Sequence, residues 1–175
     1  MTGSESETWP QDIYRILVNN RVRQVAYVPD MGHARLIEMC HKSSDIKAVV
    51  LTTEEEGVAL LAGAWLGGER GVLLMQSSGV GNCINMLSLT RICRMPLLIL
   101  VAMRGQWGEF NPWQIPMGQN TNQVLISAGV MTFAVDDQNR VKETVEAATK
   151  IAFEGSAATA VLISQRILGA KTFGK

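Results

Sequence analysis

The chain has 175 residues, 47% of them hydrophobic, and its 16 lysines and arginines balance its 16 aspartates and glutamates. That length fits one domain of roughly 100 to 200 residues. A nucleic-acid-binding protein usually needs a concentrated positive face, and this sequence has no basic block, so we expect no nucleic-acid partner. The longest apolar run, Pro96 to Met103, is far shorter than the roughly 20 residues that span a bilayer, so we also expect no membrane partner.

The N-terminal segment and the cysteines indicate the compartment. The first eight residues are polar and acidic and contain no apolar segment of the kind that directs export. Cys40, Cys83 and Cys93 lack CxxC spacing and lie in apolar surroundings. We therefore expect a cytoplasmic protein whose cysteines are reduced core residues. Residues 1–8 are expected to be a disordered tail, 9–170 a single domain and 171–175 a second tail.

Strands and helices are predicted to alternate along the chain. In chain order, the sequence predicts a helix that starts at a capping box in residues 8–11, a strand at 25–28, a helix at 33–42, a strand at 49–51, a helix at 54–66, a strand at 72–75, a helix over 79–94, a strand at 97–103, an irregular stretch at 104–117, a helix at 119–128, a strand at 130–135, a helix at 138–154 with Gly155 as its C-cap, and a strand at 160–163.

This alternation predicts a doubly wound α/β domain, with a six-stranded, mainly parallel sheet and helices on both faces. Ligands of such sheets bind beyond the carboxyl ends of the strands. The candidate functional loops are therefore those at residues 29–33, 52–56, 76–82 and 103–119.

Common catalytic and cofactor motifs are missing from the sequence. There is no GxSxG, GxGxxG or Walker motif, and His33 and His41 have no cysteine or acidic partner at a spacing that suits a triad or a metal site. The segment from Gly79 to Gly81 follows a predicted strand and could bind an anion through its backbone amides. We favour the simpler interpretation of a tight turn between strand and helix.

Three consecutive glutamates follow the second predicted strand. Thr53 and Glu56 have the spacing of a helix capping box, and acidic residues in the first turn favour the helix dipole. That interpretation explains Glu56 well and Glu55 acceptably. It leaves Glu54 as an additional carboxylate at the edge of the sheet where ligands bind.

Four stretches carry a resemblance to a known family: Val28 to Asp30, Glu54 to Gly63, Gln76 to Asn85, and Pro96 to Leu100 followed by Arg104-Gly105. In this order they resemble the pyrimidine-binding domain of thiamine-diphosphate-dependent decarboxylases. The sequence looks most like α subunits of sulfopyruvate decarboxylases, and it is similar to the N-terminal part of phosphonopyruvate decarboxylases. The resemblance extends from about residue 10 to residue 165.

The resemblance implies specific roles for residues at the cofactor. In this family a glutamate binds N1′ of the cofactor's aminopyrimidine, nine residues before the glycine of an Ala-Gly-aromatic helix, and counting back from Gly63 gives Glu54. Gln76 lies where some relatives carry a catalytic histidine, so it can orient substrate by hydrogen bonding, or it can simply satisfy loop backbone. The other implied cofactor-binding residues are Pro29, Asp30, Ser77, Ser78, Gly79 and Asn82.

The resemblance also implies a 2-oxoacid substrate with an anionic head group, which requires positive charge in the pocket. His33 and Arg104 are the candidate substrate-binding residues, although His33 can also be a surface residue at a helix N-terminus. The aromatic loop Trp107–Trp113 is predicted to be a lid over the site or a subunit interface, and the two roles are compatible.

A partner subunit is implied as well. The family binds the cofactor's diphosphate and Mg2+ through a Gly-Asp-Gly motif, and no aspartate of this sequence lies between glycines, so we assign no metal ligand here. The expected partner is a β subunit with the diphosphate-binding domain, in an α2β2 assembly or a multiple of it. The expected activity is decarboxylation of sulfopyruvate to sulfoacetaldehyde and CO2. The alternatives are decarboxylation of phosphonopyruvate or another 2-oxoacid, and a non-catalytic regulatory role.

Overall fold

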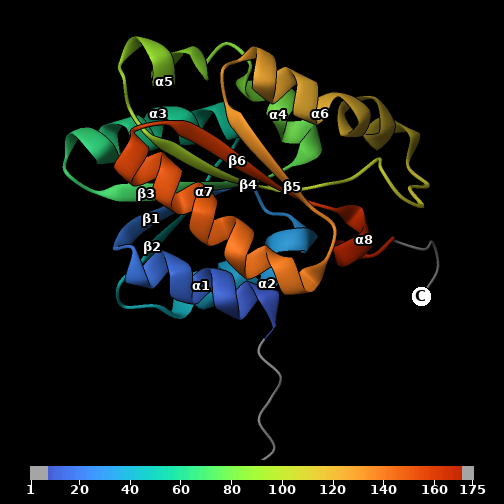
Figure 1. The fold of residues 1–175 in the computed structure, drawn as a ribbon, viewed down its shortest axis with the longest axis horizontal. Coiled ribbons are helices and arrows are strands. Elements are labelled where there is room, and N and C mark those ends of the chain that lie inside the picture. The colour runs from blue at the N-terminus through green and yellow to red at the C-terminus, as the bar shows by residue number, and fades with distance from the viewer. Residues whose placement is uncertain (1–7, 171–175) are drawn as a thin grey trace, which may run out of the picture.

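The structure, a computed structural model, describes residues 8–170, so the two predicted tails lie outside the described residues except for Thr8. Its centre is a six-stranded sheet with the strand order β2-β1-β3-β4-β6-β5 (Figure 1). Every neighbouring pair of strands is parallel, which confirms the predicted fold class. The strands are β1 (Val22–Tyr27), β2 (Lys47–Val50), β3 (Arg70–Gln76), β4 (Leu97–Ala102), β5 (Met131–Val135) and β6 (Ala158–Ile163).

Helices cover both faces of this sheet. Figure 1 shows one layer below the sheet and another above it. The lower layer contains α1 (Trp9–Asn19), α2 (Ala34–Lys42) and α7 (Val141–Gly155). The upper layer contains α3 (Glu54–Leu66), α4 (Ser77–Cys83), α5 (Ser88–Ile92) and α6 (Ile115–Ser127). The remaining elements are the short helix α8 (Gln165–Leu168) and the 3-10 turns η1 (Met31–His33), η2 (Pro112–Gln114) and η3 (Gln138–Arg140).

The central strands form the core. Every residue of β4 and of β6 is buried, as expected for parallel strands that are covered on both faces. Each fully buried leucine or isoleucine of these strands stabilises the fold by roughly 1.5–3 kcal/mol. The edge strands β2 and β5 are only partly buried. The residues that carry function therefore project from the ends of a rigid sheet.

Several predicted element boundaries were wrong. The helix expected over residues 79–94 starts at Ser77 and is two helices, α4 and α5. The helix expected from Gln119 starts at Ile115, after the 3-10 turn η2, because Pro112 and Pro116 occupy first-turn positions that need no backbone donor.

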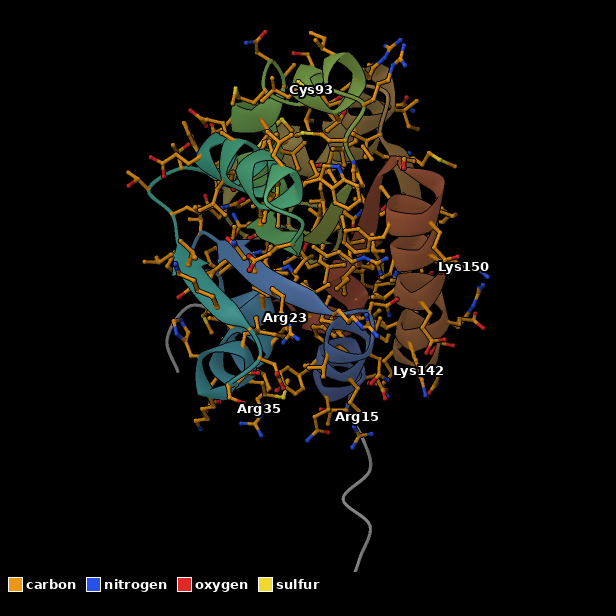
Figure 2. All side chains as sticks on the ribbon, turned by 90° about the vertical axis from the view of Figure 1, so that its left-hand side faces the viewer. Arg15, Arg23, Arg35, Cys93, Lys142 and Lys150 are labelled. Carbon is orange, nitrogen blue, oxygen red and sulfur yellow. The ribbon has the colours of Figure 1, made fainter. Side chains whose placement is uncertain are left out.

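Two further expectations need correction. Gly155 is the last residue of α7, and the left-handed C-cap is Ser156, with a φ of 52°. Cys40 and Cys83 are buried as expected, but Cys93 is exposed. Figure 2 shows Cys93 at the α5 end of the molecule, with Arg15 and Arg35 at the opposite end. Cys93 therefore contributes nothing to the core.

The described residues contain neither a membrane-spanning helix nor a metal-binding cluster. Between residues 8 and 170 no helix combines the length and apolar character needed to cross a bilayer. The same residues contain no group of three or more His, Cys, Asp or Glu side chains arranged to hold a metal ion.

The strand order places a topological switch point between β1 and β3. From β1 the chain proceeds to β2 on one side, and from β3 it proceeds to β4 on the other side. In open α/β sheets, ligands bind in the crevice at the carboxyl ends of such a strand pair. The loops that begin at Val28 and at Gln76 border this crevice.

Candidate active site

The N-terminus of α3 uses its three glutamates differently. Glu56 completes the predicted capping box, with its Oε2 accepting from the backbone N–H of Thr52 at 2.9 Å and of Thr53 at 3.4 Å. Glu55 accepts a 2.6 Å hydrogen bond from the Thr53 hydroxyl. Glu54 does neither, and it is buried, with 8% exposure. The carboxylate that helix capping leaves unexplained is therefore the one directed into the protein.

Glu54 lies against helix α4. Its Oε2 accepts a 2.8 Å hydrogen bond from the Asn82 side-chain amide. A Cβ on Gly79 would overlap the Glu54 carboxyl group, so glycine at this position leaves the space that the carboxyl group occupies. Among the described residues, no donor reaches Oε1 of Glu54. Buried carboxylates normally have several donors, so this oxygen can accept a hydrogen bond from a bound ligand.

Gly79 itself lies within α4, the helix that starts at Ser77 directly after β3. This segment is therefore helical and is not the tight turn that we favoured. Its glycine serves the close approach of Glu54, which sequence spacing did not show.

Gln76 ends β3 and makes two side-chain contacts. Its Nε2 donates to the Ser78 hydroxyl at 2.6 Å and to Oε1 of Gln114 at 2.9 Å. Both partners are side chains, whereas the simpler interpretation of Gln76 expected loop backbone. Ser77 is buried, and its hydroxyl accepts from the Arg104 N–H at 3.1 Å and donates to the Arg104 carbonyl oxygen at 3.3 Å. Ser77 thus joins the ends of β3 and β4.

The loop after β1 lies beside the same strand ends. Asp30 caps η1, with its Oδ2 accepting from the Gly32 N–H at 3.0 Å. A Cβ on Gly32 would lie 2.7 Å from the Cβ of Ala102, which pairs with Gln76 in the sheet. The structure therefore brings the loop of Pro29 and Asp30 next to Gln76 at the switch point.

His33 is not the surface residue that the alternative interpretation expected. It is 1% exposed, and its Nε2 donates a 3.1 Å hydrogen bond to the Leu100 carbonyl oxygen. Its Nδ1 has no partner among the described residues. Burial lowers the pKa of the imidazole below its usual value of 6.5, against a weaker opposing effect of Asp30. His33 thus contacts the end of the sheet as a neutral ring.

Arg104 is paired within the chain. Its Nε and Nη2 donate to the two oxygens of Glu109, at 2.6 and 2.7 Å, in a bidentate ion pair whose side chains are 10% and 3% exposed. Glu109 also accepts from the N–H groups of Gly105 and Asn111 and from the side chain of Gln165. The Arg104 hydrogen bonds, more than these others and against the effect of burial, lower the pKa of Glu109 to about 2. The charge of Arg104 is therefore already compensated.

The segment from Arg104 to Gln114 folds back on itself. Oε1 of Gln165 accepts from the N–H groups of Gln106 and Trp107, at 3.1 and 3.0 Å. The Arg166 guanidinium lies 3.7 Å from the centre of the Trp107 ring. Two of the loop's aromatic side chains remain largely exposed, Trp107 at 52% and Trp113 at 80%. The sequence analysis did not predict roles for Glu109, Gln114 and Gln165. The one available signal was Glu109, an acidic residue between the aromatic residues of the loop.

The sequence matches a known protein family. Residues 8–124 match the family described as "Thiamine pyrophosphate enzyme, N-terminal TPP binding domain". The match covers more than half of the chain, so the chain belongs to this family.

Individual relatives are more specific. The chain is 31% identical over 152 residues to the sulfopyruvate decarboxylase subunit alpha of Methanococcus maripaludis. The aligned region covers 86% of this chain and 91% of that protein. It is 35% identical over 116 residues to the phosphonopyruvate decarboxylase of Streptomyces viridochromogenes, over 65% of this chain and 29% of that protein. The predicted resemblance is thereby confirmed.

A solved structure shares the fold. The 2-oxoglutarate:ferredoxin oxidoreductase from Magnetococcus marinus superposes with a TM-score of 0.74 at 13% sequence identity. The superposition covers 93% of this chain and 29% of that chain. This likeness supports the fold assignment alone.

Proposed function

We propose that this chain is the α subunit of a two-subunit, thiamine-diphosphate-dependent decarboxylase that converts sulfopyruvate to sulfoacetaldehyde and CO2. The observation that carries the proposal is Glu54, a buried carboxylate with one oxygen held by Asn82 and the other without a donor among the described residues. Support comes from the family match and from the sulfopyruvate decarboxylase α subunit that aligns with 86% of the chain.

The residues at Glu54 suit an aminopyrimidine ring. Oε1 of Glu54 can accept a hydrogen bond from a ring N–H, and the Asn82 amide holds the other oxygen so that the carboxylate keeps its orientation. Gly79 lets the carboxylate lie against α4 without a side chain between them. When bound, thiamine diphosphate would supply the electron sink for the loss of CO2.

The roles of this chain's residues follow from their positions. Glu54 would hold a proton shared with the ring nitrogen, which requires an ionised or proton-sharing carboxylate shielded from water. Pro29 and Asp30 on the other side of the crevice, and Ser78 on α4, would border the cofactor ring. Gln76 cannot act as an acid or base near neutral pH, so its proposed role is to orient the reacting groups by hydrogen bonding.

A β subunit is part of the proposal. The five aspartates of this chain do not lie between glycines, and the described residues contain no cluster for a metal ion, so we assign the diphosphate and Mg2+ to the partner. The relative from Methanococcus maripaludis is itself named a subunit. An α2β2 complex or a multiple of it would form the site between chains, and the exposed Trp107 and Trp113 suit such an interface.

A phosphonopyruvate decarboxylase is the second candidate. It is favoured by the 35% identity to the Streptomyces viridochromogenes enzyme, but this chain matches only 29% of that protein. A non-catalytic regulatory role is less favoured, because a regulatory homologue has no need of a buried carboxylate in the position of Glu54.

The proposal is tested by CO2 release from sulfopyruvate, using this chain co-expressed with a β subunit and supplied with thiamine diphosphate and Mg2+. Phosphonopyruvate and pyruvate serve as comparators, and each subunit alone is the control. We expect turnover of sulfopyruvate by the pair only. Preferential turnover of phosphonopyruvate would show that phosphonopyruvate, and not sulfopyruvate, is the substrate. No turnover by a folded complex with bound cofactor would contradict the decarboxylase assignment.

A further inference from the structure

The hydrogen bonds of Gln76 determine which atom of the Gln114 side chain can bind a ligand. An amide nitrogen carries two hydrogens, and those of Gln76 go to Ser78 and to Oε1 of Gln114. This arrangement leaves Oε1 of Gln76 as an acceptor and Nε2 of Gln114 as a donor. Neither atom has another hydrogen-bond partner in the described part of the chain, and both side chains are half-buried.

Gln114 is held firmly in this position by the segment before it. Gly105, with a φ of +76°, lies directly against the backbone of Gln114, where a Cβ would overlap the Gln114 carbonyl group. The Gln119 side chain donates to the Gly105 carbonyl oxygen at 2.8 Å, and Glu109 ties the same turn to Arg104. The amide of Gln114 is therefore preorganised at the carboxyl end of β3, and little conformational entropy is lost on binding.

The neighbouring cations are committed elsewhere. Arg104 is bidentately bound to Glu109, and the burial of His33 lowers its pKa. Arg166 stacks on Trp107 after β6, and β4 separates β6 from β3 in the sheet. The open donors beside Gln76 among the described residues are thus two neutral groups, the Ser78 hydroxyl and Nε2 of Gln114, and Gln114 is the one that lies outside the surface assigned to the cofactor ring.

The site and this donor are connected through α4. Gly79 of that helix contacts Glu54, and Ser78, one residue earlier, binds Gln76. Met117, three residues after Gln114, lies against Gly81 of the same helix. Glu54 and Gln114 are therefore both linked to α4, and a small substrate bound beside the cofactor at the switch point can reach Gln114.

We propose that Gln114 is a specificity-determining residue, whose Nε2 donates hydrogen bonds to the anionic head group of the 2-oxoacid substrate. This inference rests on the proposed function, and it names the donor on this chain that distinguishes a sulfonate or phosphonate from an uncharged methyl group. The contact is made equally in the ground state and the transition state, so its loss raises KM and leaves kcat nearly unchanged.

Two substitutions separate this role from a purely supporting one. Gln114→Glu keeps an acceptor for Gln76 but removes the donor, whereas Gln114→Met removes both. If Gln114 only orients Gln76, we expect kcat and KM of Gln114→Glu to stay close to the wild-type values and kcat of Gln114→Met to fall. If Gln114 binds the head group, both variants raise KM. Gln123→Glu, at an exposed glutamine of α6, the helix that follows Gln114, is the control for added negative charge.

The experiment measures kcat and KM of the complete complex for sulfopyruvate and for pyruvate. We expect Gln114→Glu to raise KM for sulfopyruvate at least tenfold, with kcat within about threefold, and to change KM for pyruvate much less. Equal changes for both substrates, or an unchanged KM for sulfopyruvate beside an active wild type, would overturn the inference and leave the proposed function intact.

A second measurement keeps the inference testable if no oxoacid is turned over. Binding of 3-sulfopropionate, an unreactive sulfonate with a carboxylate, is measured by calorimetry on the complex. We expect Gln114→Glu to weaken binding about tenfold relative to wild type and to Gln123→Glu. Identical affinity of the three proteins, or no binding to wild type, would overturn the assignment of Gln114.

Discussion

Two buried carboxylates show how differently one side-chain type is used in this molecule. Glu109 lies in the loop after β4, with a bidentate arginine, two backbone N–H groups and a glutamine as donors. Glu54 lies at the start of α3, and within residues 8–170 Asn82 is the one residue that donates a hydrogen bond to its carboxylate. Both side chains are largely buried, but only Glu109 has protein donors to both of its carboxylate oxygens.

The difference separates structure from proposed function. A fully satisfied buried carboxylate fixes the fold around it, and here it fixes the loop that carries Gln114. A carboxylate with one oxygen held and the other left without a protein donor can offer that second oxygen to a ligand. Substitutions at Glu109 should therefore act first on stability, and substitutions at Glu54 should act on activity.

The largest expected effect is at Glu54. Glu54→Gln keeps the shape and the contact with α4 but cannot hold the proton, so we expect turnover by the α–β complex to fall about 10²- to 10⁴-fold. Circular dichroism and complex formation should be unchanged. Glu55→Gln, in the same helical turn, is the matched control and should retain activity. Turnover of Glu54→Gln within a few-fold of wild type would show that this carboxylate is not the one that acts on the cofactor.

The second effect is the loss of stability when Glu109 is removed. Glu109→Ala leaves the Arg104 guanidinium buried without its partner, which destabilises by about 3–5 kcal/mol. Urea unfolding of the chain measures the change. Glu143→Ala removes the partner of Arg140 in an exposed ion pair, and it should barely shift the unfolding midpoint. Equal effects of the two substitutions would mean that the buried network adds nothing to stability.

The third expectation concerns pH. The pKa of Glu109 is lowered from its usual 4.5 to about 2, so its ionised form is favoured by folding. Its contribution is fully present above about pH 4.5 and is lost as the pH falls toward 2. The difference in unfolding free energy between wild type and Glu109→Gln should therefore shrink over that interval. Other carboxylates titrate there as well, and the paired comparison cancels them; a constant difference would contradict the lowered pKa.

The sequence predicted the fold and singled out Glu54 as a candidate, because both inferences depend on local patterns. Apolar runs of strand length alternate with amphipathic stretches, and these fix a parallel sheet with two helical layers. The capping box of Thr53 and Glu56 is equally local, so Glu54 remained as the residue without a structural role. The family resemblance assigned it a role independently.

The rest of the site depends on contacts between distant segments. Gln165 binds the backbone of Gln106 and Trp107 across more than 50 residues, and no periodic pattern reports such a pair. The compensation of Arg104 by Glu109 required the loop to fold back, which single-sequence reasoning could not foresee. The burial of His33 could not be predicted for the same reason, because it depends on a contact with β4.

The smallest expected effect tests whether Glu54 needs its close approach to α4. Gly79→Ala places a methyl group where the Glu54 carboxyl group lies, so the carboxylate must shift away from Asn82. A displacement of this kind lowers turnover about tenfold or somewhat more, because catalytic groups tolerate little misplacement. Gly81→Ala is the matched control, since its Cβ would meet the Met117 sulfur at 3.5 Å, an ordinary contact. Steady-state rates of the two complexes decide the point. A deficit confined to Gly79→Ala means that activity depends on the position of Glu54, whereas equal rates would mean that the Glu54 carboxylate needs no close approach to α4 in order to act.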